Sequence, residues 1–240
     1  MFPSWSAFEP TRGAWHLDAA DKVITAAAAN HIQLSGAFLY STKWATPPGA
    51  TGHPFPMGHL DDWSEYVGKV VDRYKDRIQY WEIWNEPNGG FKGHYGKDKW
   101  DTTTDYATLV ARAYAAARKS DPKARIGISV ASFDPLYIHQ LLLAQAKMGR
   151  PENFDFFCIH PYETIGDLSE ADGEIPFLWM SKMLRDLLKE DAPNRPNPEI
   201  WITEIGRRIG KLKESKEVDN VQESDAAQTM VKAYIMAILL

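Results

Sequence analysis

The chain has 240 residues, with 32 acidic and 27 basic side chains and a formal net charge of −5 at pH 7. This length suits a single domain, because α/β barrels commonly reach it as one unit. The acidic balance leaves no basic footprint for nucleic acid, and no run of about 18 apolar residues could span a membrane. We therefore expect neither a nucleic-acid partner nor a membrane partner.

Cys158 is the only cysteine, which excludes a disulfide framework and a cysteine metal cluster. It lies in the apolar run Phe154–Ile159, a setting typical of an inert core thiol. The segment Met1–Trp5 lacks the basic and apolar regions of a signal peptide. The compartment and the oligomeric state stay open, and a secreted or periplasmic location is compatible with the sequence.

Along the chain, apolar segments of strand length alternate with patterned segments of helix length. The tail of a strand is expected at Met1–Trp5, followed by a helix over Leu17–Asn30 with acidic residues in its first turn. Five full strands are then predicted at Ile32–Ser41, Ile78–Asn85, Arg125–Ala131, Phe154–His160 and Glu199–Glu204. Further helices are predicted at Leu60–Tyr74, Thr103–Ser120, Leu136–Met148, Pro176–Glu190 and Ser224–Leu240. Near-continuous apolar strands between helices predict a parallel sheet built from right-handed βαβ units.

The lengths of the connections distinguish between two parallel folds. Long segments follow the strands, whereas the connections from helix back to strand are short; the long ones are Ala45–His59, Pro87–Thr102, Tyr162–Glu174 and Arg207–Glu223. A barrel whose active face is built from its βα loops shows this asymmetry. An open doubly wound sheet usually carries a glycine-rich phosphate turn after its first strand, and this chain has none. The predicted fold class is α/β, a (β/α)8 TIM barrel.

The number of predicted strands falls short of a closed barrel, which has eight. We expect residues 1–240 to be a single catalytic barrel domain, with about strands two to seven present and strand one, most of strand two and strand eight lacking. Such a barrel exposes two apolar sheet edges. We therefore expect this chain, expressed alone, to be poorly soluble and inactive.

Two predicted strands end in a glutamate. The segment Tyr80–Asn88 reads Tyr-Trp-Glu-Ile-Trp-Asn-Glu-Pro-Asn and carries Glu86 in its turn, and a later strand ends at Glu204. Two carboxylates at the carboxyl ends of buried strands are the minimum equipment for retaining hydrolysis of a glycosidic bond. The alternative is that each is a loop residue bonded to backbone. Glu82 shares the face of Glu86 but lies about 13 Å deeper along the strand, so we interpret it as pairing inside the barrel.

These segments resemble a known clan, the retaining glycoside hydrolases with an eight-fold β/α barrel, which includes the family 5 cellulases and the family 39 β-xylosidases. Trp81–Asn88 resembles the strand-four motif with the acid/base, Trp201–Glu204 the strand-seven motif with the nucleophile, and His160–Tyr162 the His-x-Tyr that ends strand six. Trp5–Trp15 and Tyr40–Ala45 resemble the segments after strands two and three. The residues around Glu86 place the chain closest to family 39, or to a family 5-like relative.

The resemblance implies a role for each site residue. Glu86 would be the acid/base and Glu204 the nucleophile that forms a covalent glycosyl-enzyme, with the two carboxyl groups about 5–5.5 Å apart. Asn85 would donate to the sugar 2-hydroxyl, and Tyr162 would donate its hydroxyl to Glu204. His160 would bind a sugar hydroxyl or orient a carboxylate.

Aromatic side chains supply further candidates. Trp5 and Trp44 are expected to contact substrate, with core packing as the alternative for Trp44, whereas packing is favoured for Trp84. His53 and His59 have no third ligand at metal spacing, so no metal site and no cofactor is expected. The predicted function is retaining O-glycoside hydrolysis of a plant- or microbial-type oligo- or polysaccharide. A noncatalytic carbohydrate-binding barrel and a transglycosylase are the alternatives.

Overall fold

The computed structural model describes residues 2–89, 102–149, 152–165, 168, 172–195, 197–206 and 220–239. Its strands form a five-stranded parallel sheet in which each strand lies beside the next one in the chain. They are β1 (Leu34–Phe38), β2 (Ile78–Ile83), β3 (Arg125–Ala131), β4 (Phe156–His160) and β5 (Glu199–Ile202). The predicted parallel α/β sheet is thereby confirmed.

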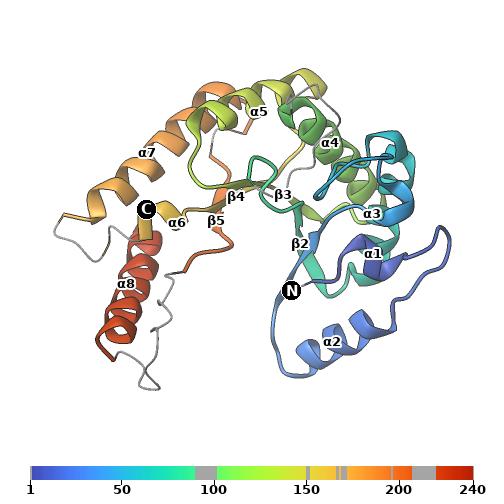
Figure 1. The fold of residues 1–240 in the computed structure, drawn as a ribbon, viewed down its shortest axis with the longest axis horizontal. Helices are drawn as coiled ribbons and strands as arrows, with labels where there is room; N and C mark the ends of the chain where they lie inside the picture. Colours follow the sequence, from blue (N-terminus) through green and yellow to red (C-terminus); the bar gives the residue numbers. More distant parts are fainter. Residues whose placement is uncertain are drawn as a thin grey trace.

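Helices cover the outer side of this sheet and follow its curvature as an arch (Figure 1). The helices are α1 (Trp5–Phe8), α2 (Asp18–Ala29), α3 (Leu60–Tyr74), α4 (Thr102–Ser120), α5 (Pro135–Met148), α6 (Tyr162–Ile165), α7 (Glu174–Asp191) and α8 (Asn220–Leu239), with 3₁₀ turns η1 (Lys43–Ala45) and η2 (Met57–His59). Helices α3, α4, α5 and α7 pack side by side in that order, while α2 and α8 lie at the two ends of the arch (Figure 1). No helix in the described ranges combines the length and apolarity that a bilayer crossing requires.

The register of the sheet determines where functional side chains gather. Phe38 of β1 lies beside Ile83 of β2, and Ala131 of β3 lies beside His160 of β4. Because parallel strands in chain order all end at the same edge of the sheet, the residues that follow β2, β4 and β5 emerge next to one another. This edge carries both predicted glutamates.

The core lies between the sheet and the outer helices and is rich in aromatic rings. Trp63, Tyr66 and Trp81 are fully buried, and Phe38 stacks on Trp81 with ring centroids 5.0 Å apart. Cys158 of β4 is also fully buried, and burial raises the pKa of its thiol. This burial supports the predicted inert core thiol.

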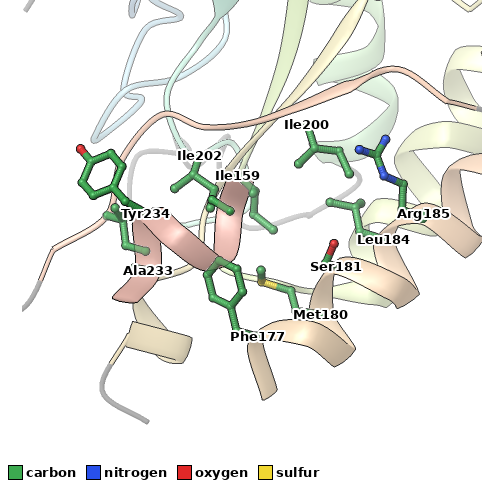
Figure 2. Close-up of a pocket in the computed structure, with 12 residues that line it drawn as sticks. Ile159, Phe177, Met180, Ser181, Leu184, Arg185, Ile200, Ile202, Ala233 and Tyr234 are labelled. Atoms are coloured by element: carbon green, nitrogen blue, oxygen red, sulfur yellow. The ribbon is translucent and has the colours of Figure 1, made fainter. Parts of the chain in front are cut away.

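A cavity of about 210 Å³ lies between the outer face of β4 and β5 and the helices α7 and α8 (Figure 2). Ile200 and Ile202 of β5 line it, together with Phe177 of α7 and Ala233 of α8. Successive strand residues point to opposite faces, so Thr203, which follows Ile202, points to the inner face. Ile205, the residue after Glu204, also lines the cavity, so the cavity extends to the strand end that carries this glutamate.

The strand tail predicted at Met1–Trp5 is wrong over its described residues. Residues 2–4 belong to no strand and Trp5 begins α1. The backbone N–H of Trp5 donates to the carbonyl of Leu39 at 3.1 Å, just past β1, but Pro3 has no N–H with which to continue a ladder. Of the predicted long connections, residues 90–101, 166–167, 169–171 and 207–219 lie outside the described residues.

Candidate active site

Strained backbone marks the carboxyl ends of β1 and β2. Tyr40, Trp84 and Glu86 have φ angles of 55°, 67° and 47°. Such left-handed conformations are uncommon for residues with side chains and unusual for bulky ones, and they concentrate at functional sites. The surrounding structure must therefore impose the left-handed backbone conformation of Glu86.

The two predicted catalytic carboxylates lie together. One carboxylate oxygen of Glu86, one of Glu204 and a ring nitrogen of His160 all lie within 4.8 Å of one another. The side chain of Glu86 is 18% exposed and that of Glu204 is 40% exposed, so both reach solvent. Retaining glycosidases hold their two carboxyl groups about 5–5.5 Å apart, and this pair is compatible with that spacing.

His160 is the buried link between these carboxylates. Its Nδ1 lies 3.0 Å from Oε1 of Glu86 and 3.9 Å from Oε2 of Glu204. Burial opposes protonation of the ring, but the carboxylate of Glu82 at 3.7 Å, the hydrogen bond to Glu86 and the charge of Glu204 outweigh it, and the pKa of His160 is raised. Of the two predicted roles for His160, the structure shows the carboxylate contact.

Thr203 and Glu82 hold the other side of the His160 ring. Nε2 of His160 lies 3.0 Å from the Thr203 hydroxyl, which in turn donates to Oε1 of Glu82 at 3.2 Å. Since that hydroxyl has given its only proton to Glu82, it accepts from Nε2–H. Glu82 thus pairs inside the sheet, as expected, and Nδ1 of His160 faces Glu86.

Tyr162 and Asn85 complete the polar surroundings. The Tyr162 hydroxyl donates to Oε2 of Glu204 at 3.3 Å, the predicted contact. Burial and the charge of Glu204 raise the pKa of Tyr162, so it remains a donor at neutral pH. Nδ2 of Asn85 donates to the hydroxyl of Tyr40 at 3.3 Å.

Trp5, Trp44 and Trp84 have different surroundings in the structure. Trp5 is fully buried, stacks on Tyr66 with centroids 5.2 Å apart, and donates Nε1 to Glu9 at 2.9 Å. Its indole cannot reach a sugar, so Trp5 is removed from the substrate-binding set. Trp44 is half-buried, meets Trp5 edge-on at 5.3 Å, and donates to the Glu9 carbonyl. Trp84 is fully buried, which supports packing.

Two residues of this site were not singled out by sequence reasoning. Thr203 was visible only as the residue before Glu204, and Tyr40 only as the start of a motif after the third barrel strand. Burial and the charges of Glu204 and Glu86 raise the pKa of Tyr40. An aromatic hydroxyl at a strand end was the available signal for Tyr40.

The cluster of Glu86, His160 and Glu204 could offer three ligand atoms to a metal ion. A metal needs a neutral imidazole, whereas the neighbouring carboxylates raise the pKa of His160 and favour its protonated form. Acetal hydrolysis by two carboxylates requires no metal. The donor set therefore fits acid/base chemistry better than metal binding.

A curved parallel sheet with glutamates on two strand ends defines the class of protein, a clan of β/α-barrel glycoside hydrolases. The sequence model of glycosyl hydrolase family 10 matches residues 3–129, more than half of the chain. The chain belongs to this family. The placement closest to family 39, or to a family 5-like relative, is wrong, because the motif around Glu86 identifies the clan without resolving the family within it.

Two curated relatives align with part of the chain. Endo-1,4-beta-xylanase C of Paenibacillus barcinonensis is 27% identical over 144 residues, which cover 53% of this chain and 13% of that protein. Endo-1,4-beta-xylanase 2 of Claviceps purpurea is 29% identical over 140 residues, which cover 54% and 39%. The chain thus spans less than half the length of either relative.

Solved structures resemble nearly the whole chain. A psychrophilic family 10 endo-beta-1,4-xylanase superposes with a TM-score of 0.66 at 15% identity, covering 97% of this chain and 70% of that one. Xylanase B from Clostridium stercorarium F9 superposes with a TM-score of 0.64 at 17% identity, covering 98% and 72%. This likeness confirms the predicted barrel fold class.

Proposed function

We propose that this protein is a retaining endo-1,4-β-xylanase in which Glu86 is the acid/base and Glu204 the nucleophile. The observation that carries the proposal is the cluster of Glu86, Glu204 and His160, whose nearest polar atoms lie within 4.8 Å of one another. The substrate class, β-1,4-linked xylan, is supported by the names of the curated relatives.

In the first step, Glu86 gives its proton to the glycosidic oxygen as the bond from that oxygen to the anomeric carbon breaks. Glu204 attacks the anomeric carbon from the opposite face, and its oxygen forms an ester with the sugar. The hydrogen bond from Tyr162 holds the Glu204 carboxylate. After proton transfer Glu86 is an anion, and its hydrogen bond with Nδ1 of His160 stabilises that charge.

In the second step, Glu86 takes a proton from a water molecule whose oxygen attacks the anomeric carbon. The ester bond breaks, Glu204 leaves as a carboxylate, and Glu86 is again protonated. Two inversions at the same carbon return the starting configuration. The same two carboxylates therefore serve both steps.

The test traps the covalent intermediate. The intact protein is incubated with 2,4-dinitrophenyl 2-deoxy-2-fluoro-β-xylobioside, whose fluorine slows both steps while its leaving group keeps the first one possible. Mass spectrometry of the digested protein should find the sugar on Glu204, and the Glu204→Gln variant should carry no label.

Absence of label, together with measurable affinity for xylooligosaccharides, would instead identify a noncatalytic binding barrel. A transglycosylase would be labelled as well, so the products from xylohexaose are also separated by size. Shorter oligosaccharides indicate hydrolysis, and oligosaccharides longer than the substrate indicate transfer.

A further inference from the structure

A second group of contacts adjoins the carboxylates and has no part in the chemistry above. It joins the end of β1 to the end of β2 through Tyr40 and Asn85, and it includes His53 from the segment between η1 and η2. The rings of Tyr40 and His53 stack with centroids 3.8 Å apart and planes inclined by 19°.

The stacked pair is built into the fold. The Ser41 hydroxyl donates to the Pro54 carbonyl at 2.6 Å, and this bond fastens the residue after His53 to the residue after Tyr40. On another side, the Tyr40 ring meets the edge of the buried Trp84 ring at 5.7 Å. Tyr40 itself has a φ of 55°, which an aromatic residue adopts only when its surroundings impose it.

The consequence falls on Asn85, the residue before Glu86. Its amide nitrogen carries two hydrogens in one plane, and one of them is donated to the Tyr40 hydroxyl at 3.3 Å. When one N–H of a planar amide is held, the direction of the other is set as well. Asn85 is the group proposed to donate to the sugar 2-hydroxyl, a contact that strengthens in the transition state.

We propose that Tyr40 is a positioning residue that orients the Asn85 amide toward the 2-hydroxyl of the sugar being cleaved, and that His53 holds Tyr40 in place by stacking. This inference rests on the proposed function. Burial lowers the pKa of His53, so its ring is neutral where it stacks at neutral pH. No proton is moved by Tyr40 or His53; their effect is on geometry alone.

The test compares two substrates that differ in the 2-hydroxyl. The kcat/KM value is measured for 2,4-dinitrophenyl β-xylobioside and for its analogue without the 2-hydroxyl on the sugar to be cleaved. The Tyr40→Phe variant should lose about tenfold on the hydroxylated substrate, the size of one hydrogen bond, and nothing on the deoxy substrate. An equal loss on both substrates, or no loss on either, would overturn the proposal.

Two further comparisons guard against general damage to the fold. In an Asn85→Ala background, Tyr40→Phe should have no additional effect, because the group it positions is gone. His53→Phe, which keeps a stacking ring, should retain the wild-type preference for the hydroxylated substrate, whereas His53→Ala should reduce it. If both His53 variants showed the same preference for the hydroxylated substrate, His53 would not act by stacking.

The outcomes also separate this inference from the function on which it depends. If the wild-type protein is labelled on Glu204 but Tyr40→Phe acts equally on both substrates, only the positioning role fails. If the intact protein used in the labelling test neither takes label on Glu204 nor hydrolyses either substrate, the proposed xylanase activity fails as well.

Discussion

The two carboxylates have unequal surroundings, and this inequality supports the roles proposed for them. Glu86 has the buried His160 at 3.0 Å and is the less exposed of the two, whereas Glu204 receives the Tyr162 hydroxyl. An acid/base carboxyl group loses and regains a proton, so it benefits from a neighbour that can stabilise both its protonated and its charged form. A nucleophile must instead stay ionised and accessible.

Glu86→Ala should therefore lose activity on xylan, whereas an added nucleophile should restore its turnover of an activated substrate. We expect hydrolysis of xylan to fall by about 10²–10⁴-fold, because its leaving group needs a proton. A dinitrophenyl xylobioside needs none, so the ester should form and then persist. Added azide should restore turnover and give the β-glycosyl azide, identified by nuclear magnetic resonance; an α-azide, or no response to azide, would contradict the assignment.

The raised pKa of His160 makes a prediction about stability. A group whose pKa is higher in the folded protein stabilises the fold fully below its unfolded value, about 6.5, and this contribution is lost as the pH rises through the folded value. The Tm difference between wild type and His160→Gln should thus be larger at about pH 5.5 than at about pH 9. A difference independent of pH would show that His160 contributes only packing.

At the scale of the elements, close packing explains where small residues stand in the strands. A Cβ atom added to Gly36 of β1 would lie 2.3 Å from the Trp81 ring of β2, and one added to Gly127 of β3 would meet Phe156 at the same distance. Both rings are almost fully buried, on opposite faces of the sheet. Neither glycine has room for a methyl group without movement of an aromatic ring.

Gly36→Ala is therefore expected to lower the free energy of unfolding by about 1–3 kcal/mol, the usual cost of overpacking. Urea titration followed by tryptophan fluorescence measures it. Gly58→Ala is the matched control, because a Cβ at Gly58 has nothing within 4 Å. A loss of the same size in both variants would mean that the ring contact does not set the cost.

The sequence allowed the elements to be predicted where hydrophobic pattern decides them. The predicted strand Arg125–Ala131 and helix Leu60–Tyr74 have the observed bounds. An apolar run defines the strand, and an amphipathic pattern with acidic residues in its first turn defines the helix. The predicted substrate contact of Trp5 was wrong, because whether an indole packs or binds depends on partners that are distant in sequence. For the same reason the contact of His160 with Glu86 followed from the fold rather than from the motif.

At the scale of the whole molecule, the arch places chemistry and apolar surface on different parts. The polar site lies at the carboxyl edge of the sheet, whereas α8 lies at the end of the arch beyond β5 (Figure 1). Val231, Tyr234, Ile235 and Ile238 of α8 are 60%, 65%, 53% and 82% exposed. Their spacing of three and four residues puts them on one face of the helix.

A continuous apolar stripe of this kind drives association in water, because its burial removes apolar area from solvent. We expect the 240-residue chain to self-associate with rising concentration, seen as growing sedimentation coefficients in velocity ultracentrifugation. Ile238→Lys should shift this association to higher concentration without lowering Tm, since the side chain is already exposed. Val23→Lys on α2, where the valine is 65% exposed, is the matched control. An equal effect of both substitutions would attribute the association to added charge rather than to the stripe, and a monomer at all concentrations would show that α8 drives none.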